Sequence, residues 1–197
     1  MSAQLRRLLA RQEGLITLEQ AASAGLSARA VQHRVRSGAW MRIRPRLYLV
    51  GGHPLTDGTA VRAAGMWIGD AGAVSGVAAA WWHGLLPGPP PLIEVTVPHG
   101  TRRRPPDGIR IRRRDLDVRD LVGIRGIWVT AMPLTVLETA VRLDDGAAFL
   151  DRALQRQVSF EQLHAAFCRT VNAKGAPPCD GCWSRPPIAR TRRRSGH

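Results

Sequence analysis

The chain has 197 residues, of which 44% are hydrophobic and 22% are charged, ordinary proportions for a globular protein. Its formal net charge is +14, and Lys174 is the single lysine among 29 basic residues, so arginine carries almost all of the positive charge. The sequence offers no apolar run near the ~20 residues of a membrane span, no signal peptide, and three cysteines without a disulfide framework. We therefore expect a soluble, cytoplasmic protein of one or two small domains.

The charge is unevenly distributed along the chain. Residues 1–52 contain nine arginines and two glutamates, whereas residues 53–171 contain fourteen arginines and twelve acidic residues. A GC-rich coding sequence enriches arginine everywhere, but it does not remove acidic residues from one end. The N-terminal excess therefore indicates a polyanionic partner.

Residues 2–25 predict two short helices. The first ends at Gly14, and the second begins at Thr17, three residues before Gln20. This is the spacing of a capping box, in which the two side chains satisfy unpaired amides at a helix start. Gly25 suits the left-handed position that ends a helix. The residues predicted to face inward are Leu5, Leu8, Leu9, Leu18, Ala21 and Ala22.

Residues 26–38 predict a third helix, which Ser27 caps and Gly38 ends, with Ala28, Val31 and Val35 facing inward. Two short helices joined by about three residues that include a glycine are typical of a helix-turn-helix. Glutamine pairs with adenine and arginine with guanine in the major groove, so the outward face has the chemistry to read bases. That face carries Arg29, Gln32, His33 and Arg36, with Arg34 at its flank.

Residues 40–50 predict a basic hairpin, because apolar and arginine residues alternate before Pro45 and the segment LYLV then runs back. Such a wing meets phosphates or the minor groove. An alternative is a small helical domain whose polar face is merely rich in arginine. The DNA-binding candidates are Thr17, Ser27, Arg29, Gln32, His33, Arg34, Arg36, Arg42, Arg44 and Arg46.

The stretch GLITLEQAASAGLSARAVQHRVRSGAWMRIRPRLYLVGG (residues 14–52) resembles the N-terminal winged-helix domain of AbiEi-type antitoxins. Looser similarity continues in the family's order over residues 12–170. The resemblance implies a DNA-binding transcriptional regulator that binds inverted repeats in its own promoter, with two copies, and so a homodimer, on each operator. Some members counter a nucleotidyltransferase-like toxin from the same operon. Others carry a C-terminal nuclease-like domain, which we expect this protein to lack.

Residues 53–170 predict a near-neutral domain of helices and strands. Strands are expected at 92–97 (half-buried), 108–115 and 123–130. Helices are expected after a cap at Asp57 or Thr59, from Ser75 to residue 86, and at 133–143, 145–157 and 159–169. The predicted fold class is α+β, with a winged helix-turn-helix (1–52), a small mixed α/β domain (53–170) and a disordered basic tail (171–197).

Two features of the middle segment have alternative interpretations. Trp81-Trp82-His83 suggests base stacking or a ligand pocket, but the favoured interpretation is one core tryptophan and one that covers a domain junction. The arginines of 102–104 and 110–114 either extend a phosphate-binding surface or lie on a solvent-exposed strand edge, where charges discourage edge-to-edge pairing.

We expect no enzyme activity, cofactor or metal site. The histidines form no metal-binding repeat, Ser75 lacks the G-x-S-x-G elbow, and Asp115, Asp117 and Asp120 resemble capping and turn residues. Cys179 and Cys182 form half a zinc site at most. The unpatterned tail from residue 171 suggests a frameshifted C-terminus. The alternatives to a regulator are therefore an inactive remnant of a longer nuclease-bearing protein and a protein-interaction module.

Overall fold

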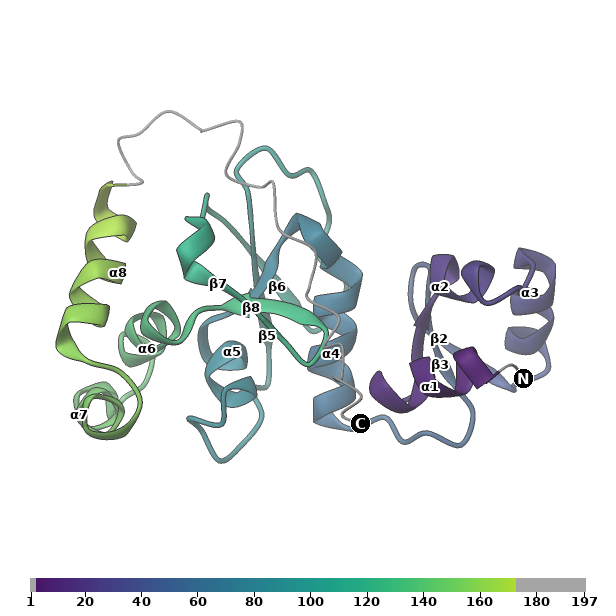
Figure 1. The fold of residues 1–197 in the computed structure, drawn as a ribbon, viewed down its shortest axis with the longest axis horizontal. Helices are drawn as coiled ribbons and strands as arrows, with labels where there is room; N and C mark the ends of the chain where they lie inside the picture. Colours follow the sequence, from purple (N-terminus) through teal and green to yellow (C-terminus); the bar gives the residue numbers. More distant parts are fainter. Residues whose placement is uncertain (1–2, 173–197) are drawn as a thin grey trace, which may run out of the picture.

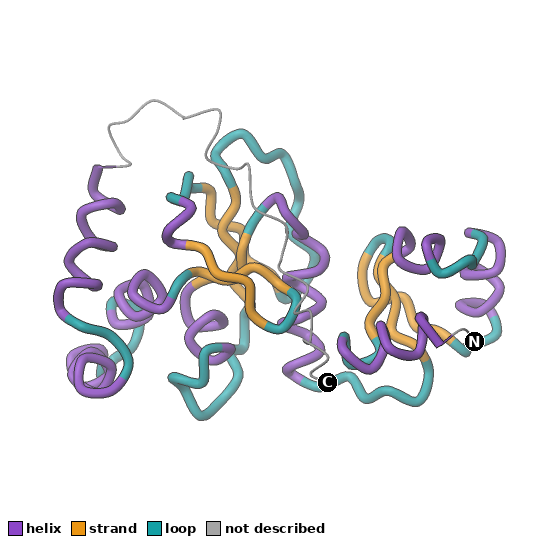
Figure 2. Tube along the Cα trace, viewed as in Figure 1, coloured by secondary structure: helices purple, strands orange, loops and turns teal. Residues whose placement is uncertain are grey.

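A computed structural model describes residues 3–172, which form the two sheets and the surrounding helices shown in Figure 1 and Figure 2. Helix α4 contacts strands of both sheets and lies between them. The elements are α1 (Ala3–Arg11), β1 (Leu15–Thr17), α2 (Leu18–Ser23), α3 (Ala28–Arg36), β2 (Trp40–Arg44), β3 (Leu47–Val50), α4 (Asp57–Ile68), η1 (Gly69–Ala71), β4 (Ala73–Ser75), α5 (Gly76–Trp82), β5 (Ile93–Val97), β6 (Ile109–Arg113), η2 (Val118–Asp120), β7 (Leu121–Ile124), β8 (Ile127–Thr130), α6 (Met132–Ala140), α7 (Gly146–Arg156) and α8 (Phe160–Asn172).

The N-terminal helices pack on a three-stranded antiparallel sheet in the order β1-β3-β2. Three helices with a terminal β2–β3 hairpin are the arrangement of a winged helix-turn-helix, so the predicted α+β class with an N-terminal winged helix is confirmed. The apolar stripes of all three helices meet the sheet in one core, which contains Leu5, Leu9, Ile16, Ala21, Val31, Trp40 and Tyr48.

The helix starts follow the predicted capping chemistry. Thr17 and Gln20 form the reciprocal capping box at α2, and Ser27 Oγ accepts a hydrogen bond from the amide of Ala30 at the start of α3. Two inward assignments were wrong, because Ala22 and Ala28 are exposed. Adjacent residues diverge by about 100° around a helix, so Ala22 points away while Ala21 is buried, and Ala28 occupies the solvated first turn of α3.

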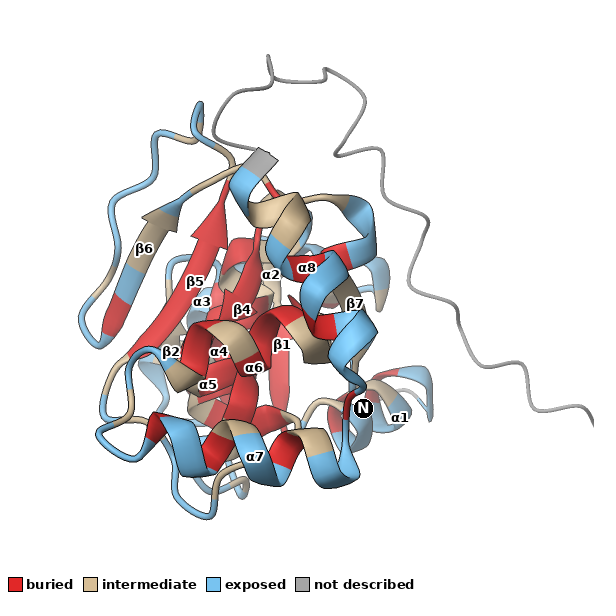
Figure 3. Ribbon diagram, turned by 90° about the vertical axis from the view of Figure 1, so that its left-hand side faces the viewer, coloured by how far each residue is buried: buried red, intermediate tan, exposed pale blue. Residues whose placement is uncertain are grey.

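The second sheet is mixed, with the order β6-β5-β4-β8-β7. One face carries Val74, Val95 and Val129, which pack on α4 and α5 in a single core. The other face carries Ser75, Glu94 and Thr96, and residues of α6 and of the turn after it cover this face. Strand β5 is therefore buried along its whole length, as Figure 3 shows in red, and the half-buried prediction for this strand was wrong.

The polar face of this sheet is stabilised by hydrogen bonds and ion pairs instead of apolar packing. Arg142 donates to Glu94 at 2.8 Å, and Thr96 Oγ1 donates to Ser75 Oγ at 2.8 Å. Glu138 of α6 accepts from Arg112 of β6 and from Arg114, the residue that follows this strand. The period-two alternation in the sequence is thus present, but its polar side is buried as well.

Several predicted boundaries differ from the structure. Residues 123–130 are not one strand but parts of β7 and β8, joined at Arg125 and Gly126, both of which have positive φ (50° and 84°). The helix predicted from Ser75 begins one residue later and ends at Trp82, since Ser75 belongs to β4. The cap of α4 is neither Asp57 nor Thr59 but Thr56, whose hydroxyl accepts from the amide of Thr59.

The Trp81-Trp82-His83 stretch has a structural role. Trp82 is 3% exposed and donates its indole N–H to the Ile124 carbonyl at 3.4 Å. Trp81 is half-buried, with its ring beside Gly58 in the first turn of α4. His83 lies with Nε2 2.9 Å from the Thr130 carbonyl. Trp81 therefore lies beside α4, the helix between the two sheets, and Trp82 is a core residue.

The predicted tail overlaps α8, because that helix continues to Asn172. The disorder assigned to residues 171 and 172 is therefore corrected. The rest of that prediction lies outside the described residues, together with the Cys179–Cys182 pair and the frameshift hypothesis.

Candidate nucleic-acid interface

Helix α3 presents one polar face to solvent. Arg29, Gln32, His33 and Arg36 are all exposed, and their spacing of three, four and seven residues places them on the same side of the helix. Nine residues of α-helix extend roughly 14 Å, enough to follow about four base pairs at 3.4 Å each. The α3 sequence contains no acidic residue.

Local contacts determine where this face lies. Val31 is fully buried, and Gly25 takes a φ of +87° in the turn between α2 and α3, a left-handed conformation that glycine adopts without strain. Arg34 differs from the four outward residues, because its guanidinium donates to the Ala30 carbonyl at 3.1 Å and lies 5.8 Å from the Trp40 ring. Arg34 therefore braces α3 against β2.

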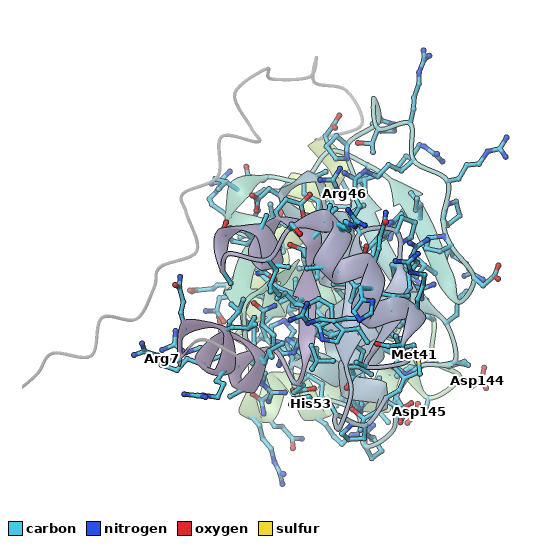
Figure 4. All side chains as sticks on the ribbon, turned by 90° about the vertical axis from the view of Figure 1, so that its right-hand side faces the viewer. Arg7, Met41, Arg46, His53, Asp144 and Asp145 are labelled. Carbon is cyan, nitrogen blue, oxygen red and sulfur yellow. The ribbon has the colours of Figure 1, made fainter. Side chains whose placement is uncertain are left out.

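The three wing arginines have different environments. Arg42 is exposed on β2, and no ion pair involves it within residues 3–172. Arg46, in the turn and labelled in the upper half of Figure 4, pairs with Glu19 at 2.6 Å across exposed surface. Arg44 donates to the Asp107 carbonyl at 3.0 Å, and burial lowers its pKa from the ordinary value. Arg42 is thus the most available guanidinium of the three.

Both N-terminal glutamates are engaged by arginines. Glu19 has a pKa below its ordinary value because its backbone amide, Thr17 and Arg46 favour the carboxylate. Glu13 accepts from Arg62 of α4 at 2.9 Å. Thr17 is itself occupied by the capping bond from the Gln20 amide. The outward face of α3 consequently has no partner carboxylate among the described residues.

The acidic residues at 115–120 have separate structural roles. Asp117 accepts from the amide of Arg119 at the start of η2 and pairs with its guanidinium, as a capping residue does. Asp120 lies in the turn of η2, where its amide donates to the Asp117 carbonyl at 2.9 Å, and its carboxylate is buried in an ion pair with Arg169 at 2.5 Å. In the part of the chain that the structure describes, no three His, Cys, Asp or Glu side chains gather to hold a metal ion.

The helix-turn-helix frame, the basic wing and the acid-free face of α3 lie within one short segment. Residues 3–51 match the family model for the AbiEi antitoxin transcriptional regulators. This AbiEi-type segment contains α1 to β3 and all ten candidate residues, and the match confirms the resemblance over this segment. The looser similarity of the following residues stays a prediction.

Other comparisons concern the chain more generally. A crystal structure of the RV2827C protein from Mycobacterium tuberculosis is similar, with 17% sequence identity and a TM-score of 0.46, and the alignment covers 89% of this chain and 77% of that one. No curated protein matches the chain. Among the described helices, none is both long and apolar enough to cross a membrane.

Proposed function

We propose that this protein is a sequence-specific, double-stranded DNA-binding regulator that represses its own promoter. The observation that carries the proposal is the outward face of α3, where arginine, glutamine and histidine side chains that can hydrogen-bond to base edges lie together, exposed and without carboxylates. The family match of residues 3–51 supports the same function.

In this proposal α3 and the wing contact DNA in different ways. Arg29 and Gln32 read base edges in the major groove, with His33 and Arg36 on the same face. Arg42 and Arg46 contact phosphates from the wing, while Arg34 and Arg44 hold α3 and the wing in place. Thr17 and Ser27 act as the caps that orient α2 and α3.

The same proposal extends to the operator and to the partners. Two copies bind an inverted repeat, and a nucleotidyltransferase-like toxin is associated with the protein only through a shared operon. Such a protein needs no cofactor and no catalytic residue.

Binding to duplex DNA tests the proposal. The wild-type protein is titrated into a labelled fragment of its own promoter and into a mixed-sequence duplex of equal length, at several salt concentrations. We expect tighter binding to the promoter and a steep loss of affinity with salt on both. Equal affinity for the two duplexes would refute sequence-specific binding, and no binding even at low salt would refute the function altogether.

A further inference from the structure

The loop between β5 and β6 carries three consecutive arginines beside the wing. Residues 102–104 line an open groove of about 620 Å³, together with Thr17 and Glu19 at the start of α2, Pro45 and Arg46 of the wing, and the end of α4. In Figure 1 the loop lies at the upper edge of the molecule, past the C-terminal end of α4. Residues more than fifty positions apart in the sequence thus share one surface.

Two arginines hold this loop in place. Arg103 donates to the Trp67 carbonyl at 2.8 Å, and its guanidinium lies 5.8 Å from the Trp67 ring. Arg113 of β6 donates to the carbonyls of Thr101 and Arg103, at 3.3 and 3.4 Å. The loop is therefore anchored to both α4 and β6.

Arg102 and Arg104 are the remaining arginines of the loop. Both are exposed, and neither forms a hydrogen bond or ion pair with any other residue between positions 3 and 172. By contrast, seven of the fourteen arginines in residues 53–171 are ion-paired with carboxylates. The loop therefore holds two free guanidinium groups next to Arg46.

A solvated strand edge does not account for these two residues. The edge strand β6 has its own exposed arginines, Arg110 and Arg113, whereas Arg102 and Arg104 precede the strand in the loop. The groove also contains Glu19 and Asp70, but Glu19 is paired with Arg46 and Asp70 accepts from the Trp128 indole at 2.9 Å. Positive charge is thus the unsatisfied charge of this surface.

We infer that Arg102 and Arg104 bind backbone phosphates of the duplex whose bases α3 reads, so that the second sheet's loop extends the wing's phosphate contacts. The inference rests on the proposed function. Phosphate contacts of this kind add affinity on any sequence and release condensed counterions, with a salt slope of about 0.9 per phosphate on duplex DNA. They add nothing to base discrimination.

The test compares three double variants of the full chain on the promoter fragment and on the mixed-sequence duplex across a salt series. Arg102→Gln with Arg104→Gln should lower the salt slope by about 1.8 and weaken both duplexes by the same factor. Arg102→Lys with Arg104→Lys keeps the charges and should retain most of the slope. Arg110→Gln with Arg156→Gln removes the same charge from exposed arginines outside the groove and should leave the slope near the wild-type value.

The outcomes separate this inference from the function on which it rests. If the wild type prefers its promoter but the Gln variant matches the wild type or the control, the loop does not contact DNA while the regulator function stands. If the wild type binds neither duplex, both fail. Circular dichroism of each variant confirms folding, which substitution of two exposed, unbonded side chains should not disturb.

Discussion

His83 has an environment that couples protonation to stability. Burial lowers its pKa below the ordinary value, and the hydrogen bond with the Thr130 carbonyl only partly offsets this effect. The folded state therefore takes up the proton less readily than the unfolded chain. Stability is complete above the ordinary histidine pKa and falls as pH drops below it.

We predict that the free energy of unfolding of the wild type decreases between pH 7.5 and pH 5.5, and that His83→Gln shows a smaller decrease. Urea unfolding at each pH measures this. His99→Gln, which changes an exposed imidazole, serves as the control and should keep the wild-type dependence. Identical pH dependence in the wild type and His83→Gln would show that His83 is not the group responsible.

At the scale of the element, the wing has three arginines with unequal freedom. Arg42 has no ion pair among the described residues, Arg46 shares its charge with Glu19, and Arg44 is bound to the Asp107 carbonyl. A phosphate gains most from a guanidinium that is not already engaged. The three side chains should therefore contribute unequally to DNA affinity, although their spacing in the sequence makes them look equivalent.

We predict that Arg42→Ala lowers the salt slope of DNA binding by about 0.9, Arg46→Ala by less, and Arg44→Ala least, with all sequences weakened alike. Affinity measured against salt concentration on a mixed-sequence duplex ranks the three. A largest effect at Arg44 would contradict this order and would mean that its bond to Asp107 opens when DNA binds.

The elements with strong periodicity or clear caps could be predicted from the sequence. The capping box at Thr17 and the cap at Ser27 depend on residues only three positions apart, so the sequence predicts both, and the structure confirms them. Strands β1 and β4 have three residues each, which is too short for an alternating pattern to be recognised, so the sequence does not predict them. Ala22 was misplaced because alanine indicates little about which way it faces.

At the scale of the molecule, a buried arginine joins the AbiEi-type segment to the rest of the chain. Arg62 of α4 is 3% exposed, donates to Glu13 and to the Arg125 carbonyl, and lies 5.2 Å from the Trp82 ring. Loss of the Glu13 charge leaves this guanidinium without its carboxylate partner in a poorly solvated position, which is costly.

We predict that Glu13→Gln lowers the free energy of unfolding by about 1–3 kcal/mol. Glu19→Gln, which removes the exposed partner of Arg46, is the matched control and should cost at most about 1 kcal/mol. Chemical denaturation of the two variants compares them. If Glu19→Gln lowered the free energy of unfolding as much as Glu13→Gln, the buried Glu13–Arg62 pair would have no special role in stability.

The candidate site was only partly predictable from the sequence, because part of it depends on how distant segments of the chain pack together. The face of α3 is local, since one helix and its cap determine it. The neighbourhood of Arg102, Arg104 and Arg46 depends on how α4 packs between the two sheets, and the sequence left phosphate binding and a solvated edge as equal alternatives. The bond between Arg44 and Asp107 likewise joins residues 63 positions apart.

The most direct test of the central claim is the ratio of the dissociation constants for the mixed-sequence and promoter duplexes, measured for the wild type, Arg29→Ala and Gln32→Ala. If α3 reads bases, each substitution should reduce this ratio by the equivalent of ~1–3 kcal/mol while leaving the salt slope on mixed-sequence DNA almost unchanged. A ratio that stays at the wild-type value in both variants would show that this face of α3 does not read the operator.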